Sequence, residues 1–163
     1  MRIFALDPGT KCGWAAMDDG GTCISGVGDF RLHKDGEPGK RFLQFREFLQ
    51  ERLAWLKPDL VVFEQAFVMP RGATTAIFFG LIAVLQAECF AHAVETKTVN
   101  AMTLKKWTTG YGRATKALML EHVNKRWKTI THGPSECIPT CTDPAHDEAD
   151  AIAVLHYAME HLT

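Results

Sequence analysis

Several features that mark other protein classes are missing from this chain of 163 residues. No apolar run is long enough to cross a bilayer, since the longest extends only from Ala76 to Leu85. The N-terminal sequence MRIFALDPG has no signal-peptide architecture, so a cytoplasmic location is expected. Disorder is also excluded, because 47% of the residues are hydrophobic and only 23% are charged. The length favours one domain spanning residues 1–163.

Cysteine is scarce and unevenly placed. The chain has five cysteines, and this odd, scattered set argues against a disulfide scaffold. Cys137, Cys141 and His146 lie in one predicted loop. Their C-x3-C-x4-H spacing supplies only three ligands and fits no common zinc module. We therefore interpret the cysteines as reduced thiols, with a zinc clip in this loop as the alternative.

Net charge is nearly absent, but the charges are unevenly distributed. The formal net charge is −1, which does not by itself indicate a nucleic-acid partner. Between Lys97 and Lys128 the chain has eight basic residues and one acidic residue, whereas residues 129–163 contain six acidic residues and neither Lys nor Arg. This pattern fits a phosphate-binding surface beside a cation site. Solvated helix faces explain it equally well, so charge alone leaves both interpretations open.

The order of predicted elements indicates a mixed α/β fold. Strand-like segments at 2–6, 13–17 and 22–32 are separated by turn sequences and predict an antiparallel meander. Further strands are predicted at 60–63 and 94–99, and helices at 37–57, 74–93, 103–108, 114–127 and 144–161. The order βββ-α-β-α-β-α-α-α predicts a central five-stranded mixed sheet with helices on both faces.

Four carboxylates at the ends of predicted elements are candidates for chemistry. Asp7 closes the first strand in an Asp-Pro-Gly turn, where Asp is common for turn geometry alone. Glu64 closes a buried strand, where an acid needs a partner. Asp147 and Asp150 are three residues apart at the start of the last predicted helix, so their side chains share a face. The alternative role for this pair is to place negative charge at the positive N-terminal end of the helix dipole.

Together the four acids meet one physical requirement. Hard divalent cations such as Mg²⁺ prefer oxygen ligands, and a two-metal phosphodiester site needs several carboxylates from different elements. In a mixed sheet, adjacent strand ends and a covering helix terminus would bring these acids together. The sequence therefore predicts a metal site formed by Asp7, Glu64, Asp147 and Asp150.

Four motifs in order resemble the RuvC family of Holliday-junction resolvases. They are LDPGTKCGWA, FEQAF, KKWTTGYGRATK and DEADAIAV, and their spacing covers nearly the whole chain. The resemblance implies an RNase H-like fold and a metal-dependent endonuclease that nicks Holliday junctions and other branched DNA symmetrically, producing 5′-phosphates. It also implies that the four acids hold two Mg²⁺ ions per active site, for which Mn²⁺ can substitute.

The resemblance further implies residues that act near DNA. Phe67 falls where the family presents an aromatic ring to a base at the crossover, although core packing is what the residue alone suggests. Lys116 falls where a lysine could offset charge at the cleaved phosphate, which implies a catalytic role. The remaining residues implied to contact DNA are Arg71, Lys105, Lys106, Gly110, Gly112 and Arg113. The alternative for Arg71 is an ordinary exposed arginine in a turn. The alternative for Gly110 and Gly112 is a simple break between two helices.

The predicted helix at 74–93 is apolar on nearly every side, so it is buried either in the core or by a second subunit. The RuvC family forms homodimers through a helix at this place. A four-way junction has near two-fold symmetry, and two symmetric nicks need two related active sites. A purely core role is the alternative for the expected interface residues, which are Ile77, Phe78, Leu81 and Leu85.

Other functions remain as alternatives. The segment DPGTKCG also resembles the first phosphate loop of actin-like ATPases and sugar kinases, but those proteins pair two such domains and 163 residues cannot supply both. A relative that binds junctions without cutting them is a second alternative, and a nuclease acting on RNA–DNA hybrids is a third. Residues 129–144 form a longer loop than is typical of the family, and the overall charge is less basic than in many DNA-binding proteins, which leaves substrate selectivity open. The sequence also leaves base preference and any branch-migration motor open.

Overall fold

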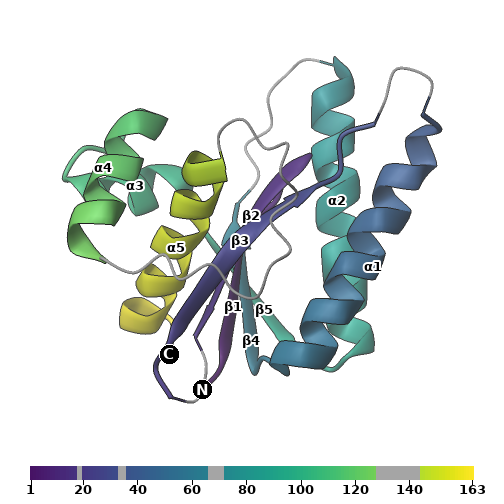
Figure 1. The fold of residues 1–163 in the computed structure, drawn as a ribbon, viewed down its shortest axis with the longest axis horizontal. Coiled ribbons are helices and arrows are strands. Elements are labelled where there is room, and N and C mark those ends of the chain that lie inside the picture. Colours follow the sequence, from purple (N-terminus) through teal and green to yellow (C-terminus); the bar gives the residue numbers. More distant parts are fainter. Residues whose placement is uncertain (18–19, 33–35, 66–71, 128–143) are drawn as a thin grey trace.

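The computed structural model describes residues 1–17, 20–32, 36–65, 72–127 and 144–163. A five-stranded sheet lies between helices that cover both of its faces (Figure 1). The strands are β1 (Ile3–Asp7), β2 (Lys11–Met17), β3 (Cys23–Asp29), β4 (Leu60–Glu64) and β5 (Glu95–Val99). The helices are α1 (Pro38–Leu56), α2 (Gly72–Ala91), α3 (Ala101–Thr109), α4 (Lys116–Arg126) and α5 (Pro144–His161). The predicted element order and mixed α/β architecture are confirmed.

The strand order β3-β2-β1-β4-β5 decides where the ends of the strands meet. β1, β2 and β3 form the predicted antiparallel meander, and β4 and β5 run parallel to β1. In the pairing of β1 with β4, Leu6 stands beside Phe63. Asp7 and Glu64 directly follow these two residues, so both acids come to the same edge of the sheet on neighbouring strands.

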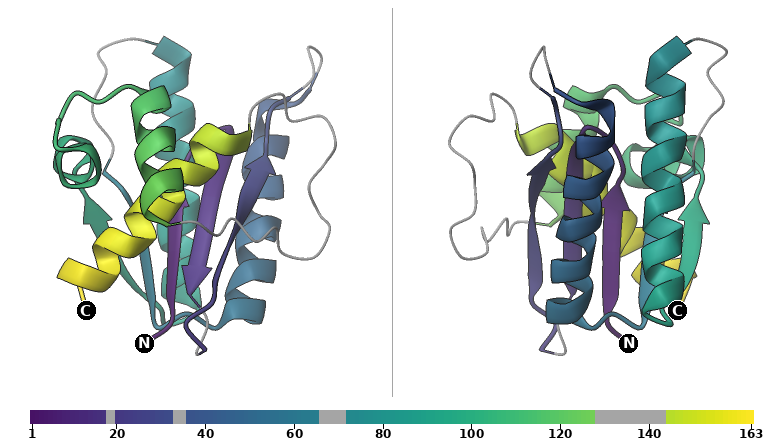
Figure 2. Two further views of the ribbon diagram at one scale, coloured as in Figure 1. Left: turned by 60° about the vertical axis from the view of Figure 1, so that its left-hand side comes forward. Right: turned by 90° about the vertical axis from the view of Figure 1, so that its right-hand side faces the viewer.

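Alternate residues of each strand build two separate cores, as expected for a sheet covered on both faces. Phe4 and Leu6 of β1 pack with α1 and α2, whereas Ile3 and Ala5 pack with α5 and the helices beside it. Figure 2 shows α1 and α2 side by side on one face, with α5, α3 and α4 on the other. The sheet is therefore rigidly held from both sides beneath its acid-bearing edge.

Most helix boundaries follow local capping chemistry. α1 starts at Pro38, which suits a first-turn position, and ends at Leu56, followed by Lys57 as a left-handed cap before Pro58. α3 starts two residues earlier than predicted because the Asn100 side chain accepts hydrogen bonds from the backbone N–H groups of Met102 and Thr103. Within the described ranges, no helix is both long and apolar enough to cross a membrane.

Candidate active site

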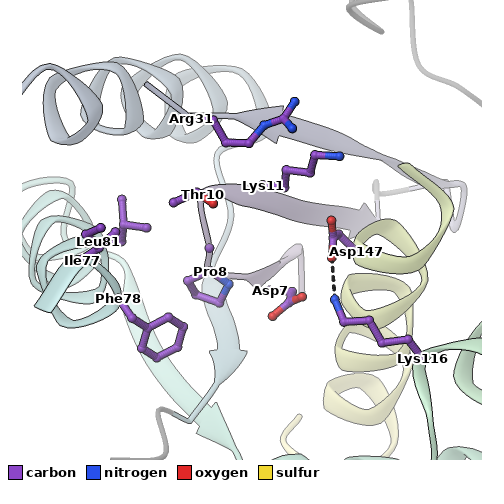
Figure 3. A pocket seen from close by; sticks show the side chains of 11 residues that line it. Asp7, Pro8, Thr10, Lys11, Arg31, Ile77, Phe78, Leu81, Lys116 and Asp147 are labelled. Atoms are coloured by element: carbon purple, nitrogen blue, oxygen red, sulfur yellow. Dashed lines mark hydrogen bonds and ion pairs between the residues drawn. The ribbon is translucent and has the colours of Figure 1, made fainter. Parts of the chain in front are cut away.

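The four predicted acids are delivered to one edge of the sheet by three elements. Asp7 ends β1 and Glu64 ends the neighbouring strand β4. Asp147 and Asp150 lie in the first turns of α5, which packs across β1, β2, β3 and β4. In Figure 3 the Asp7 and Asp147 side chains approach the same space from the strand and the helix. The residues that the sequence places far apart are thus brought together by the strand order and by α5.

Gly13 lets α5 approach the sheet. It pairs with Asp7 across β1 and β2, and a Cβ atom at this position would stand 1.8 Å from the carbonyl oxygen of Asp147. No other residue type leaves room for the helix backbone at this distance. The glycine of the LDPGTKCGWA motif therefore serves the site by allowing the first turn of α5 to rest directly on β2.

Burial and mutual repulsion make three of the carboxyl groups, those of Asp7, Glu64 and Asp150, hard to ionise. Burial raises the pKa of Asp7 well above its usual value, and the carboxylates of Asp150 and Glu64 raise it further. Burial also raises the pKa of Glu64, with Asp150 as the next contribution. The pKa of Asp150 rises to about 6, chiefly through burial, although the Lys116 and Lys105 ammonium groups oppose this. Ionising these carboxyl groups together therefore needs more positive charge than the nearby lysines supply.

Lys116 is the cation closest to this cluster by direct contact. It is the first residue of α4, after the Thr115 N-cap, and its Nζ donates to Asp147 Oδ1 at 2.8 Å (Figure 3). Burial opposes its charge, but the hydrogen bond to Asp147 and the nearby carboxylates of Asp7 and Asp150 raise the pKa of Lys116 overall. A permanently charged lysine at the acids is suited to contact a phosphate group.

The donor set fits a hard divalent cation. Carboxylate oxygens are the ligands that Mg²⁺ and Mn²⁺ prefer, and a bound cation would relieve the repulsion that raises these pKa values. Among the residues that the structure describes, no three His, Cys, Asp or Glu side chains are grouped closely enough to hold one ion. The carboxylates would therefore have to draw together around a cation, and Asp147 would have to exchange its contact with Lys116.

A cavity of about 410 Å³ opens beside the acids. The β1–β2 turn forms its floor and α2 forms one wall. Lys11, at the start of β2, and Arg31, two residues after the end of β3, form another wall (Figure 3). Sequence reasoning missed the two cations on this wall, because a lysine at a strand end and an arginine after a strand carry no local signal. The lining residues are Asp7, Pro8, Gly9, Thr10, Lys11, Arg31, Ile77, Phe78, Leu81, Lys116 and Asp147.

His146 is a second residue that sequence reasoning did not assign to this site. It precedes Asp150 by one helical turn, and its positive form would lower the pKa of that carboxyl group. Its Nδ1 atom lies 3.3 Å from the Lys116 carbonyl oxygen. The i, i+4 spacing of His146 and Asp150 is the sequence signal for this placement. From the sequence, His146 was predicted only as a ligand of the alternative zinc clip.

The remaining predicted DNA contacts are spread over α3, α4 and their connection. Lys105 is half-buried and close enough to lower the pKa of Glu64 and Asp150, whereas Lys106 and Arg113 are exposed. Gly110 caps α3 with a φ of 81°, which accounts for this glycine by backbone geometry alone. A Cβ at Gly112 would come within 3.3 Å of the Met102 carbonyl oxygen. The predicted residues Phe67, Arg71, Cys137 and Cys141 lie outside the described residues.

The residues predicted for the dimer interface differ in exposure. Leu81 and Leu85 are 0% exposed within a single chain, because they pack into the core under α2, and this burial favours the alternative of a core role. Ile77 and Phe78 are half-buried and line the cavity beside the acids. The apolar residues of α2 that do face outward include Phe79, at 42% exposed, and Phe90, at 88% exposed. A helix that is apolar all round gives no periodic signal for its outer face.

Comparison with known proteins identifies relatives in sequence. A crossover junction endodeoxyribonuclease RuvC from Halorhodospira halophila is 30% identical over 156 residues, covering 93% of this chain and 86% of the relative. The protein of that name from Ruegeria pomeroyi is 28% identical over 156 residues, covering 94% and 88%. No family model matches the chain.

Solved structures share the fold. Thermus thermophilus RuvC in complex with a Holliday junction substrate matches with a TM-score of 0.71 at 16% identity, covering 99% of this chain and 96% of that chain. The yeast mitochondrial Holliday junction resolvase matches with a TM-score of 0.61 at 12% identity, covering 93% and 75%. These likenesses show the RNase H-like fold that the resemblance implied. Together with the sequence relatives, they show that the chain belongs to the RuvC family.

Proposed function

We propose that the chain is a crossover junction endodeoxyribonuclease that hydrolyses phosphodiester bonds in Holliday junctions and other branched DNA. The observation that carries this proposal is the convergence of Asp7, Glu64, Asp147 and Asp150 at one edge of the sheet. Carboxyl groups that are buried or half-buried and repel one another serve no purpose in folding, but they are what a metal-dependent hydrolase needs. The names of the sequence relatives and the junction complex of the structural neighbour support the same reaction.

The four carboxylates would hold Mg²⁺, with Mn²⁺ as a substitute, as two ions in each site. When bound, such ions activate a water molecule for attack on phosphorus and stabilise charge on the departing 3′ oxygen, which leaves a 5′-phosphate. The chain contributes the position of the carboxylates on two rigid strand ends and one helix. Because burial has already removed water from Asp7 and Asp150, their ionised forms depend on a counter-charge arriving with the ions.

Besides the metal ions, the Lys116 side chain would supply positive charge at the site. Its Nζ atom lies 2.8 Å from Asp147 Oδ1. If the Asp147 carboxylate bound a metal cation instead of Lys116, the Lys116 ammonium group would be free to contact the phosphate oxygens, where negative charge develops. Lys105, which lies within electrostatic reach of Glu64 and Asp150, would add positive charge near the same phosphate.

DNA would approach over α3, α4 and the segment between them. Lys106 and Arg113 are exposed there and suit phosphate contacts, and the glycines at 110 and 112 leave the backbone uncovered. The roles of Phe67 at the crossover base and of Arg71 at the backbone belong to the same proposal. Because phosphates supply most of the contacts, binding should weaken steeply as salt is raised. Junction shape, rather than base sequence, would dominate recognition.

The enzyme would act as a homodimer, since two symmetric nicks require two related sites. The outer face of α2 offers a surface for a two-fold contact. Phe79 and Phe90 are separated by eleven residues, close to three helical turns, and Ala83 lies between them on the same exposed stripe. Exposed phenylalanines on one face of a helix indicate an interaction surface. Phe79 and Phe90 are therefore the residues of α2 that we propose for the dimer contact.

The test uses a labelled synthetic four-way junction with wild-type protein and with the Asp7→Asn variant. Each is incubated with Mg²⁺, with Mn²⁺ and with EDTA. We expect paired symmetric nicks from the wild type with either metal, and none with EDTA or from the variant, which should still bind the junction. Binding without nicks under every metal condition would make the protein a junction binder. If neither binding nor nicks are seen, the proposal fails and ATP hydrolysis becomes the activity to measure.

A further inference from the structure

The cavity beside the acids has two chemically different walls. Lys11 and Arg31 border it on the side of β2 and β3, whereas Ile77 and Phe78 of α2 border it on the other side (Figure 3). Asp7 lies at its floor. Its volume of about 410 Å³ falls in the range of roughly 300–1,000 Å³ that is usual for pockets holding one small molecule. The cavity is thus large enough for a single nucleotide unit and far too small for a duplex.

The cationic wall is suited to a phosphate group. In the pairing of β2 with β3, Lys11 stands opposite Asp29, and Asp29 Oδ1 accepts a hydrogen bond from Arg31 Nε at 2.9 Å. Asp29 holds the Arg31 guanidinium in place beside Lys11. Among the described residues, no carboxylate lies within ion-pair distance of the Lys11 ammonium group. Lys11 is therefore available to an incoming anion.

The opposite wall is suited to a nucleobase. Phe78 is half-buried and lines the cavity, and its side chain extends from α2 toward the side on which Pro8 and Asp7 lie (Figure 3). Leu81 closes the wall behind it and is 0% exposed. Aromatic rings that line a nucleic-acid channel accept bases of any sequence, because every base has a π-face. An apolar wall at this position has no use in metal binding or in phosphate contact.

We infer that this cavity is a subsite for the nucleotide next to the cleaved phosphodiester, with the neighbouring phosphate at Lys11 and the unstacked base against Phe78. The inference rests on the proposed nuclease function and adds to it a pocket for one nucleotide. A base at the crossover has fewer stacking neighbours than a base inside a duplex, so withdrawing it from the stack is comparatively easy. Holding that nucleotide would place the adjoining bond over Asp7.

The first test is a double-mutant cycle between the protein and the DNA. Junctions carry an abasic residue on the 5′ side or on the 3′ side of the cut, and kcat/KM is measured for wild type and for Phe78→Ala. We expect one abasic position to slow the wild type by about tenfold, the effect of losing one base–aromatic contact. The same abasic position should lower kcat/KM of the Phe78→Ala variant by less than about twofold, since the contact between base and ring is already absent. Phe78→Leu, which keeps the core filled, replaces Phe78→Ala if the latter does not fold.

The second test concerns the phosphate. Lys11→Gln should raise KM by about tenfold with kcat nearly unchanged, and should reduce the salt slope of junction binding by about one. Lys11→Arg should retain most of the wild-type KM, and Lys57→Gln, at the far end of α1, should change nothing. If neither abasic position affects the wild type, or if the abasic effect persists in Phe78→Ala, the inference is overturned.

Failure of the inference is distinguishable from failure of the proposed function. Cleavage of the unmodified junction by wild type establishes the nuclease regardless of what abasic substrates show. Equal cleavage of all junctions by the wild type would support the nuclease function and contradict the nucleotide subsite. Absence of metal-dependent cleavage of the unmodified junction would remove both.

Discussion

Ser25 on β3 donates a hydrogen bond of 2.6 Å to Glu148 on α5, and both side chains are 3% exposed. Glu148 lies between Asp147 and Asp150 in the helix. Its bond to the sheet therefore sets how α5 is turned about its axis at the point where the helix carries the two site acids. A buried carboxylate that accepts a hydrogen bond from a serine is sensitive to loss of that partner.

Removing this hydrogen bond should damage both stability and activity. Ser25→Ala leaves the Glu148 carboxylate buried without its partner, which should cost about 1–3 kcal/mol of unfolding free energy. The nicking rate should fall while junction affinity stays near the wild-type value, because DNA contacts lie on other elements. Glu148→Gln is the matched control, since its amide oxygen still accepts from Ser25. Urea unfolding and single-turnover cleavage measure the two effects, and equal losses in Ser25→Ala and Glu148→Gln would contradict this role.

A side chain at Gly13 should displace the first turn of α5. In Gly13→Ala the added Cβ would meet the Asp147 carbonyl oxygen at 1.8 Å, so the backbone of one element must move. We expect a loss of about 1–3 kcal/mol in stability and a nicking rate reduced by at least about tenfold. Gly39→Ala provides the control, because a Cβ there meets nothing within 4 Å. A Gly13→Ala enzyme with the wild-type rate would show that α5 need not rest on β2.

The raised pKa of Asp150 predicts a pH-dependent stability in metal-free protein. A carboxyl group whose pKa is higher in the folded state favours folding while it is protonated, and this contribution is lost as the pH rises from 3.8 through about 6. In EDTA, Asp150→Asn should therefore be more stable than wild type at pH 8, by up to about 3 kcal/mol. The difference should vanish near pH 4. Urea unfolding across this range provides the measurement, and a variant less stable than wild type at pH 8 would contradict the assignment.

Divalent cations should stabilise the folded protein. Binding to the folded state alone raises the unfolding free energy by RT ln(1 + [L]/Kd), which is about 2.7 kcal/mol at a cation concentration of 100 Kd. Mg²⁺ or Mn²⁺ should thus raise the melting temperature of wild type, and chelation should reverse the gain. Asp7→Asn should show a much smaller shift. Equal shifts in wild type and Asp7→Asn would place the cations away from the four acids.

The oligomeric state should depend on the outer face of α2. Phe90→Ser or Phe79→Ser should convert a dimer to monomers in sedimentation velocity experiments, because each substitution removes an exposed apolar contact. Met102→Ser is a suitable control, since Met102 is 53% exposed on α3 at the other face of the sheet. A wild-type protein that sediments as a monomer at micromolar concentration would remove the homodimer from the proposal.

Much of this protein follows from local sequence signals. Turn residues and apolar periodicity predicted all ten elements in their order, because such signals act over a few neighbouring residues. The four acids were also predicted, since each stands at the end of a strand or the start of a helix. Boundaries were less accurate where a single side chain decides them, as at the Asn100 N-cap.

Tertiary structure decided the rest, because it depends on contacts between residues far apart in the chain. The bond between Ser25 and Glu148 spans 123 positions, and no local pattern specifies it. The outward face of α2 emerged only from packing, since an all-apolar helix has no periodic signal. Lys11 and Phe78 meet across one cavity because strand order and helix packing place them there. The sequence alone thus determined the elements and the four acids, and three-dimensional packing decided how those acids are held and what surrounds them.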